Sequence, residues 1–396
     1  MTPQHSIAID ALLAHRAQFP ALANKQYFNY GGQGPMAQPT LDRIQDTYRQ
    51  IQTIGPFSGA ANQCVSELRE GLRDRMAQEL HVPSSTITLT ENVTVGCNIP
   101  LWGMNWQAGD HLLMSDCEHP GIIATVQEIQ RRFGVEVSIC PLMATLNQGD
   151  PAELLAAQLR PQTKLVVLSH ILWNTGQVLP LKAILEACRA VQPQVRVLVD
   201  AAQSVGVLPL NLTELGVDFY AFTGHKWWCG PEGVGGLYVS PEAQAAVHPT
   251  YIGWRSINFA AGGQPAGWKA GGDRYEVATS AYPLYAGLMA ALDFQSSFAT
   301  AEARYDRLLA LSKQLWQQLN AIESVECLRQ SPPEAGLVSF QLASGKHSEL
   351  VAALEQQSTQ LRLIVDPNCI RACVHYLTLE SEIEALAKTI ARILSD

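Results

Sequence analysis

The pattern of apolar residues changes character along the chain. Between about residues 86 and 240, short apolar runs alternate with stretches of helical period. Alternating strands and helices predict a mostly parallel seven-stranded sheet covered by helices on both faces, an α/β fold. The expected strands are residues 87–90, 111–116, 135–140, 164–170, 196–202, 219–225 and 235–240, and helices are expected at 125–134, 152–160 and 181–191.

From about residue 284 the pattern predicts a different kind of unit. Two long helices, two short strands and a closing amphipathic helix follow one another, which is typical of an α+β domain. These elements are expected at residues 284–299, 302–322, 336–343, 370–377 and 381–394. We therefore expect a large α/β domain over residues 20–288 and a smaller α+β domain made of residues 1–19 and 289–396. The first twenty or so residues are expected to be helical and to pack on the smaller domain.

Composition narrows the classes of partner. The chain has 396 residues and a net charge of −9, with no basic run of the kind that binds nucleic acid. Its N-terminus lacks the pattern of a signal peptide, and no apolar run is long enough to span a membrane. Nine cysteines are scattered without paired spacing, which favours neither a disulfide framework nor a metal site. We expect a cytoplasmic protein without metal, nucleic acid or membrane partners.

Two strand ends carry the strongest chemical signal. Asp200 ends one apolar strand, and Lys226 follows the next in a Thr-Gly-His-Lys turn among aromatic residues and glycines. Pyridoxal 5′-phosphate (PLP) needs a lysine for its Schiff base and an acid that keeps the pyridine nitrogen protonated. A lysine surrounded by apolar residues is also partly desolvated, which lowers its pKa and frees the amine to act. This pair predicts a PLP site, with Lys226 and Asp200 as catalytic residues.

A phosphate site is expected at a helix N-terminus, where free N–H groups and the helix dipole favour anions. The segment after the strand at 87–90 is expected to begin a helix, so Val93 and Thr94 are candidate phosphate ligands. Thr223 and His225 flank the lysine and are candidates on the other side. All four residues are predicted to bind the cofactor.

Three further side chains have chemistry that suits a PLP enzyme acting on an amino acid. His119 follows a strand and is predicted to stack on the pyridine ring or to move protons. Gln203, three residues after the strand-end acid, is predicted to reach the ring hydroxyl. Arg371 is predicted to bind the substrate carboxylate through two parallel hydrogen bonds.

Together these motifs resemble the class V aminotransferase family of fold-type I PLP enzymes, and within it the cysteine desulfurases. The resemblance runs from residues 19–35 to the last helix, and segments 118–121, 197–206 and 223–235 carry it most specifically. It implies a Schiff base at Lys226 and the ring and carboxylate contacts described above. It also implies that Thr279 reaches the phosphate of a partner subunit, and hence a homodimer.

Two departures from the family pattern bear on the chemistry. Relatives have an asparagine near the ring where this chain has Trp173, with Asn174 adjacent. Desulfurases carry a loop cysteine that attacks the substrate sulfur, whereas Cys369 lies only two residues before Arg371, too close to swing independently. Without an attacking thiol, the carbanion expels the β substituent. We therefore expect a β-eliminating C–S lyase that converts L-cystine or L-cysteine to pyruvate, ammonia and cysteine persulfide or sulfide.

The resemblance also implies sulfur supply to iron–sulfur or cofactor assembly, with a sulfur-acceptor protein as a possible partner. Tyr251 and Arg255 are candidates for the distal carboxylate of cystine, and Gly32 in the N-terminal loop is a further candidate for substrate binding. Three alternatives remain. They are a desulfurase that makes alanine, an epimerase or kynureninase-like enzyme on the same scaffold, and a catalytically idle binding protein.

Overall fold

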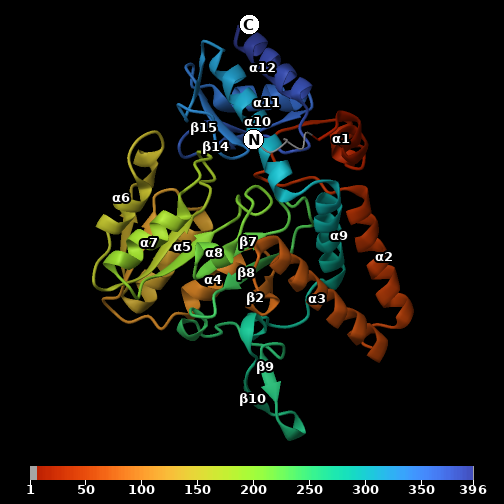
Figure 1. The fold of residues 1–396 in the computed structure, drawn as a ribbon, viewed down its shortest axis with the longest axis vertical. Coiled ribbons are helices and arrows are strands. Elements are labelled where there is room, and N and C mark those ends of the chain that lie inside the picture. The colour runs from red at the N-terminus through yellow and green to blue at the C-terminus, as the bar shows by residue number, and fades with distance from the viewer. Residues whose placement is uncertain (1–6, 396) are drawn as a thin grey trace.

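The computed structural model describes residues 7–395 and contains a large and a small β-sheet (Figure 1). The large sheet has seven strands in the order β2-β8-β7-β6-β5-β3-β4. Neighbouring strands are parallel from β4 to β7, and β8 alone runs antiparallel to both of its neighbours. The strands are β2 (Ile87–Thr90), β3 (His111–Ser115), β4 (Glu136–Cys140), β5 (Thr163–Ser169), β6 (Arg196–Asp200), β7 (Phe219–Thr223) and β8 (Gly235–Val239). The prediction of a mostly parallel seven-stranded sheet is confirmed.

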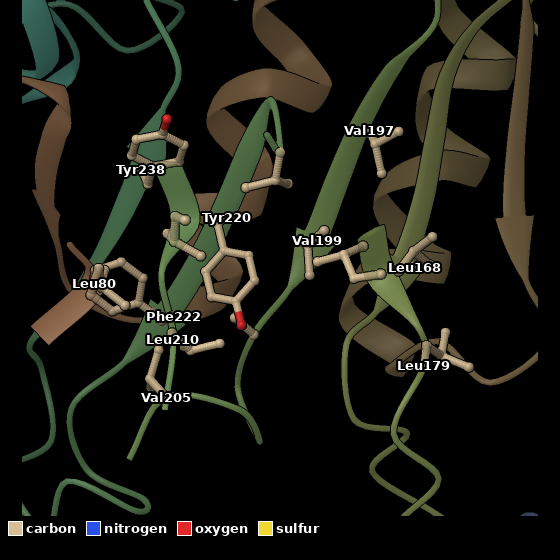
Figure 2. Close-up of a cluster of buried hydrophobic side chains, with 14 of the residues drawn as sticks. Leu80, Leu168, Leu179, Val197, Val199, Val205, Leu210, Tyr220, Phe222 and Tyr238 are labelled. Atoms are coloured by element: carbon tan, nitrogen blue, oxygen red, sulfur yellow. The ribbon is translucent and has the colours of Figure 1, made fainter. Parts of the chain in front are cut away.

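Alternation along the strands builds a core on each face of this sheet. Val197 and Val199 of β6 belong to one buried cluster, whereas Leu198 between them belongs to the other. Tyr220 and Phe222 of β7 lie on the same face as the two valines (Figure 2). Because both faces are buried, the strands are apolar at almost every position, as expected for a parallel sheet between helical layers.

Helices join and cover these strands, and the three helices predicted between strands are present. The helices of this part are α4 (Val93–Gly103), α5 (Pro120–Phe133), α6 (Pro151–Ala157), α7 (Leu181–Val191) and α8 (Leu212–Leu215). A glycine in the left-handed conformation ends α5 and α8, which is a common way to end a helix.

The small sheet has four antiparallel strands in the order β11-β12-β15-β14. Its strands are β11 (Val325–Cys327), β12 (Leu337–Leu342), β14 (Arg362–Ile364) and β15 (Cys369–Cys373), and its helices are α10 (Ala301–Asn320), α11 (His347–Gln356) and α12 (Glu380–Ser395). Its core is a separate buried cluster. Helix α1 (Ile9–Arg16) packs here, since Arg16 pairs with Glu382 and His15 contacts Tyr376. Residues 1–6 and 396 of the predicted small domain lie outside the described part.

Several elements were not predicted from the sequence. Helices α2 (Gln38–Ile54) and α3 (Gly59–Leu80) pack with α9 (Tyr282–Phe298), and β9 (Ile257–Phe259) pairs with β10 (Pro265–Trp268) in a hairpin that projects from the body of the protein (Figure 1). The short strands β1 (Gln26–Tyr27) and β13 (Thr359–Gln360) pair in parallel, so the N-terminal segment lies beside the small sheet. No helix within residues 7–395 combines the length and apolarity that a membrane crossing requires.

Candidate active site

A cavity of about 940 Å³ opens where the carboxyl ends of β5, β6 and β7 face the small sheet. Asp200 and Lys226 line it from the large sheet, and Arg362 and Arg371 line it from the small sheet. Ligands of open α/β sheets bind at the carboxyl ends of the strands, because the loops there converge on one edge. The N-terminal loop completes the wall with residues 29 and 31–35.

Lys226 lies in the turn after β7, and its backbone packs directly on the N-terminal loop. The N–H of Gly34 donates to the carbonyl of His225 at 2.8 Å. A Cβ on Gly34 would lie 2.1 Å from the Lys226 carbonyl oxygen, so only glycine fits there. Burial lowers the pKa of the Lys226 amine to about 8, against the opposing charge of Asp200. A measurable fraction of this amine is therefore neutral near pH 7.

Asp200 is buried at the end of β6 and accepts a hydrogen bond from the N–H of Ala202 at 2.9 Å. Burial raises the pKa of its carboxyl, while that hydrogen bond, Lys226 and His119 lower it. A carboxylate in this position is suited to bind a cationic N–H, because a buried charge needs a partner of opposite sign.

His119 begins helix α5, and its orientation is fixed by its own role as a cap. Its Nδ1 accepts from the N–H of Gly121 at 3.2 Å, which leaves Nε2 to carry the proton. The Trp173 ring stands edge-on to the imidazole at 5.8 Å, and both residues line the cavity. Burial lowers the pKa of His119, so the ring is neutral at pH 7 and suited to stacking.

The predicted helix start is present at α4, and residues 92–95 line the cavity. The Asn92 side chain caps the helix by accepting from the N–H of Val95 at 3.0 Å. Within the described residues, the N–H groups of Val93 and Thr94 have no recorded acceptor, so they are free to bind an anion. His225 lines the cavity too, and its Nδ1 lies 2.7 Å from the Thr223 hydroxyl.

These residues suit PLP. The cavity brings together a desolvated lysine, a buried carboxylate, a neutral imidazole and a helix N-terminus with free donors. Lys226 would hold the aldehyde carbon, Asp200 the pyridine nitrogen, His119 the ring face, and Val93 and Thr94 the phosphate.

The arginines of the small sheet face the cavity from paired strands. Arg371 on β15 stands opposite Arg362 on β14 in the strand register. Arg371 is buried, and its Nη1 donates to the Trp173 carbonyl at 2.6 Å, while its Nε has no partner within the described residues. Arg362 is exposed to the cavity and has no ion pair recorded among residues 7–395. The two guanidinium groups can bind two carboxylates.

Several predicted site residues lie elsewhere in this chain. Asn174 is buried behind the cavity and donates to the Asp366 carbonyl at 3.3 Å, so Trp173 takes the place at the cavity wall. Tyr251 and Thr279 line a second cavity, of about 630 Å³, which shares Thr94 and Val95 with the first.

Two more predicted residues are engaged in local contacts. Arg255 donates to the Ala278 carbonyl at 3.0 Å and to the Tyr282 hydroxyl, and it does not line the first cavity. Thr223 is fully buried and contacts His225 instead of the cavity. Gly32 and Gln203 do line the cavity, as expected.

No cysteine within residues 7–395 lines this cavity. Cys369 is fully buried on β15, and its sulfur lies 4.0 Å from the Asn174 carbonyl oxygen. Burial raises the pKa of its thiol to about 12, so the thiolate is a negligible fraction at neutral pH.

The model of the class V aminotransferase family matches residues 26–385, and the chain belongs to this family of PLP-dependent enzymes. It is similar to C-DES, a cystine C–S lyase solved in complex with its reaction product cysteine persulfide. The two are 54% identical, with a TM-score of 0.93 over 94% of this chain and 99% of that one. Another structure, a lysine mutant of C-DES with glycine covalently linked to the PLP cofactor, gives the same identity and TM-score.

Curated proteins with two different activities are also similar to this chain. The cysteine desulfurase IscS of Pectobacterium carotovorum subsp. carotovorum is 30% identical over 80% of this chain and 76% of its own length. The isopenicillin N epimerase of Amycolatopsis lactamdurans is 25% identical over 94% of this chain and 96% of its own length. The resemblance to the class V family inferred from the sequence motifs is therefore confirmed.

Arg362 was not identified from the sequence as a residue of the cavity wall. A signal was available, because Asp366, Pro367 and Asn368 are turn-forming residues between two short apolar runs. A hairpin over this segment pairs residues that lie equally far from its turn, which places Arg362 beside Arg371.

Proposed function

We propose that this enzyme is a β-eliminating C–S lyase that cleaves L-cystine to pyruvate, ammonia and cysteine persulfide. The observation that carries the proposal is the absence of any cysteine from the cavity wall within the described residues. A desulfurase needs a thiol that attacks the substrate sulfur, and Cys369, two residues before Arg371, is buried and protonated. The similarity to C-DES supports the same chemistry.

The side chains divide the reaction between them. Bound PLP supplies an electron sink for the carbanion at Cα. Lys226, whose pKa is about 8, removes the Cα proton, and the Cβ–S bond then breaks with its electron pair leaving on sulfur. The leaving group from cystine is a persulfide anion, which departs more readily than a thiolate. The three-carbon remnant takes up water to give pyruvate and ammonia.

The two arginines support cystine as the preferred substrate. Cystine carries two α-carboxylates, and the small sheet presents two guanidinium groups on adjacent strands. Arg371 is assigned to the carboxylate at the reacting end, because it is buried deeper and has an unpartnered Nε. We assign the distal carboxylate to Arg362 in place of Arg255, whose guanidinium is already bonded to the Ala278 carbonyl and the Tyr282 hydroxyl.

A homodimer is part of the proposal. Tyr251, Ile252, Trp254 and Val277 are exposed around the second cavity, where Thr279 also lies. A partner subunit on this face would cover these apolar side chains and bring Thr279 toward the other site. We further propose a cytoplasmic enzyme whose persulfide passes sulfur to an acceptor protein for iron–sulfur or cofactor assembly.

Product analysis of the PLP-loaded enzyme tests the reaction. L-Cystine and L-cysteine are supplied in turn, and pyruvate, ammonia, alanine and persulfide are measured. Equal amounts of pyruvate and ammonia, with persulfide from cystine, are expected. Alanine in place of pyruvate would indicate thiol attack, and D-cystine without pyruvate would indicate an epimerase.

A further inference from the structure

Trp227, the residue directly after the lysine, is fully buried and is held at both ends. Its indole Nε1 donates to the Oε1 of Gln203 at 2.8 Å. Its backbone carbonyl lies 3.2 Å from the Nε2 of His375, four residues beyond Arg371. One residue therefore ties the lysine turn to the predicted cofactor ligand Gln203 through its side chain and to the segment that follows β15 through its backbone.

The contacts of Gln203 allow only one orientation of its amide. An indole N–H is a donor and never an acceptor, so the atom facing Trp227 must be the amide oxygen. The amide nitrogen then faces the carbonyl of Gly31, to which it donates at 2.9 Å. One hydrogen of this nitrogen has no recorded acceptor among residues 7–395, and Gln203 lines the cavity.

The anchor on the other side of Trp227 is rigid as well. His375 is fully buried, and the ring of Tyr30 stacks on it at 4.5 Å with an interplanar angle of 13°. Burial lowers the pKa of His375 to about 3, so the ring is neutral. Its Nε2 therefore carries the single proton and donates it to the Trp227 carbonyl.

We propose that Trp227 is a positioning residue that fixes the Gln203 amide with its N–H toward the hydroxyl oxygen of the cofactor ring. The inference rests on the proposed contact between Gln203 and PLP. It adds that this contact depends on an indole N–H that does not itself touch the cofactor. Without the indole donor, only the hydrogen bond to the Gly31 carbonyl opposes a rotation that brings the amide oxygen toward the ring.

The expected consequence is electronic and is visible in the absorbance of the bound cofactor. An N–H donated to the ring oxygen stabilises its anionic form, which in turn keeps the imine nitrogen protonated. A carbonyl oxygen in the same place repels the anion. Trp227→Phe, which keeps a buried ring but removes the donor, should therefore lower the pKa of the cofactor chromophore by about one unit, a tenfold change in the protonation equilibrium.

The experiment is a pH titration of the visible absorbance of four PLP-loaded proteins and one control variant. They are the wild type, Trp227→Phe, Gln203→Ala and the double variant. Trp228→Phe is the matched control, because Trp228 is buried in the same turn but packs on Phe222 in the core. Melting temperatures of all variants report any general loosening of the fold.

The expected result is a lower chromophore pKa in Trp227→Phe and in Gln203→Ala, an unchanged pKa in Trp228→Phe, and no further shift when the first two are combined. An unshifted Trp227→Phe beside a shifted Gln203→Ala would overturn the positioning role and leave the Gln203 contact standing. An unshifted Gln203→Ala would overturn both. Equal shifts in both tryptophan variants, or full additivity in the double variant, would show that the effect does not pass through Gln203.

Discussion

The two walls of the cavity differ in how the chain builds them. One, the cofactor wall, consists of His119, Asp200, Gln203 and Lys226, which all lie at or just after the ends of strands of the large sheet. The other, the substrate wall, consists of Arg362 and Arg371 on adjacent strands of the small sheet. In a parallel sheet the carboxyl ends of successive strands lie at the same edge. A side chain that follows a strand is therefore brought to the cavity by its local sequence motif alone. The substrate wall instead depends on how a second sheet is seated over the first.

This difference predicts two kinds of mutational effect. Changes in the cofactor wall should affect every substrate alike, because PLP chemistry is shared. Changes in the substrate wall should separate cystine from cysteine where only one of them makes the contact.

The largest effect is expected for Lys226→Ala. Loss of the base that moves the Cα proton should reduce pyruvate formation from cystine and from cysteine by more than about 10³-fold. The measurement is the initial rate of pyruvate formation under saturating PLP. Lys182→Ala on the exposed face of α7 is the control and should keep full activity. Residual activity within tenfold of the wild type would rule out Lys226 as the base.

Arg371→Ala should follow, with about a 10²-fold loss of kcat/KM on both substrates. Breaking one partner of a buried charge pair costs about 3 kcal/mol, which corresponds to that factor. The absorbance of bound PLP should be retained, because Arg371 has no assigned contact with the cofactor. Loss of cofactor together with activity would instead mean that the substrate wall supports PLP binding.

The low pKa of Lys226 gives a pH prediction for capture of PLP by the cofactor-free protein. Capture requires the neutral amine, whose fraction rises with pH up to the pKa of about 8. The rate, followed by absorbance, should rise about tenfold per pH unit below pH 8 and level off above it. A rise that continues to pH 10 would contradict the lowered pKa. Asp200→Asn removes a charge that raises this pKa and should move the plateau to lower pH.

Arg362→Ala should divide the two substrates. The exposed guanidinium is assigned to the distal carboxylate that only cystine has, so kcat/KM for cystine should fall about tenfold, in line with an exposed charge-assisted contact. The value for cysteine should stay within twofold. Arg392→Ala, at an exposed position of α12, is the matched control. An equal loss on both substrates would remove Arg362 from distal recognition.

The same contrast explains how much could be predicted from the sequence. All seven strands of the large sheet were predicted, because buried strands and amphipathic helices alternate there with clear periods. The positions of Lys226 and Asp200 at strand ends could be predicted for the same reason. Arg362 was not identified, and the position of Arg255 outside the first cavity was not foreseen, because both positions depend on strand register and on packing between distant segments. Helices α2 and α3 and the β9–β10 hairpin give no comparable local signal of what they pack on.

The smallest effect is expected for Cys369→Ala, and it decides between the two sulfur chemistries. The side chain is fully buried and lies outside the cavity, so its removal should cost about 1 kcal/mol of folding stability and leave the rate of pyruvate formation unchanged. Iodoacetamide should likewise leave the folded enzyme active, because a buried thiol with a pKa of about 12 does not react at neutral pH. If either treatment abolished turnover while the protein stayed folded, a thiol would have to reach the substrate sulfur. The small sheet would then have to move during catalysis, and the two arginines of the substrate wall would not keep their positions relative to the cofactor wall.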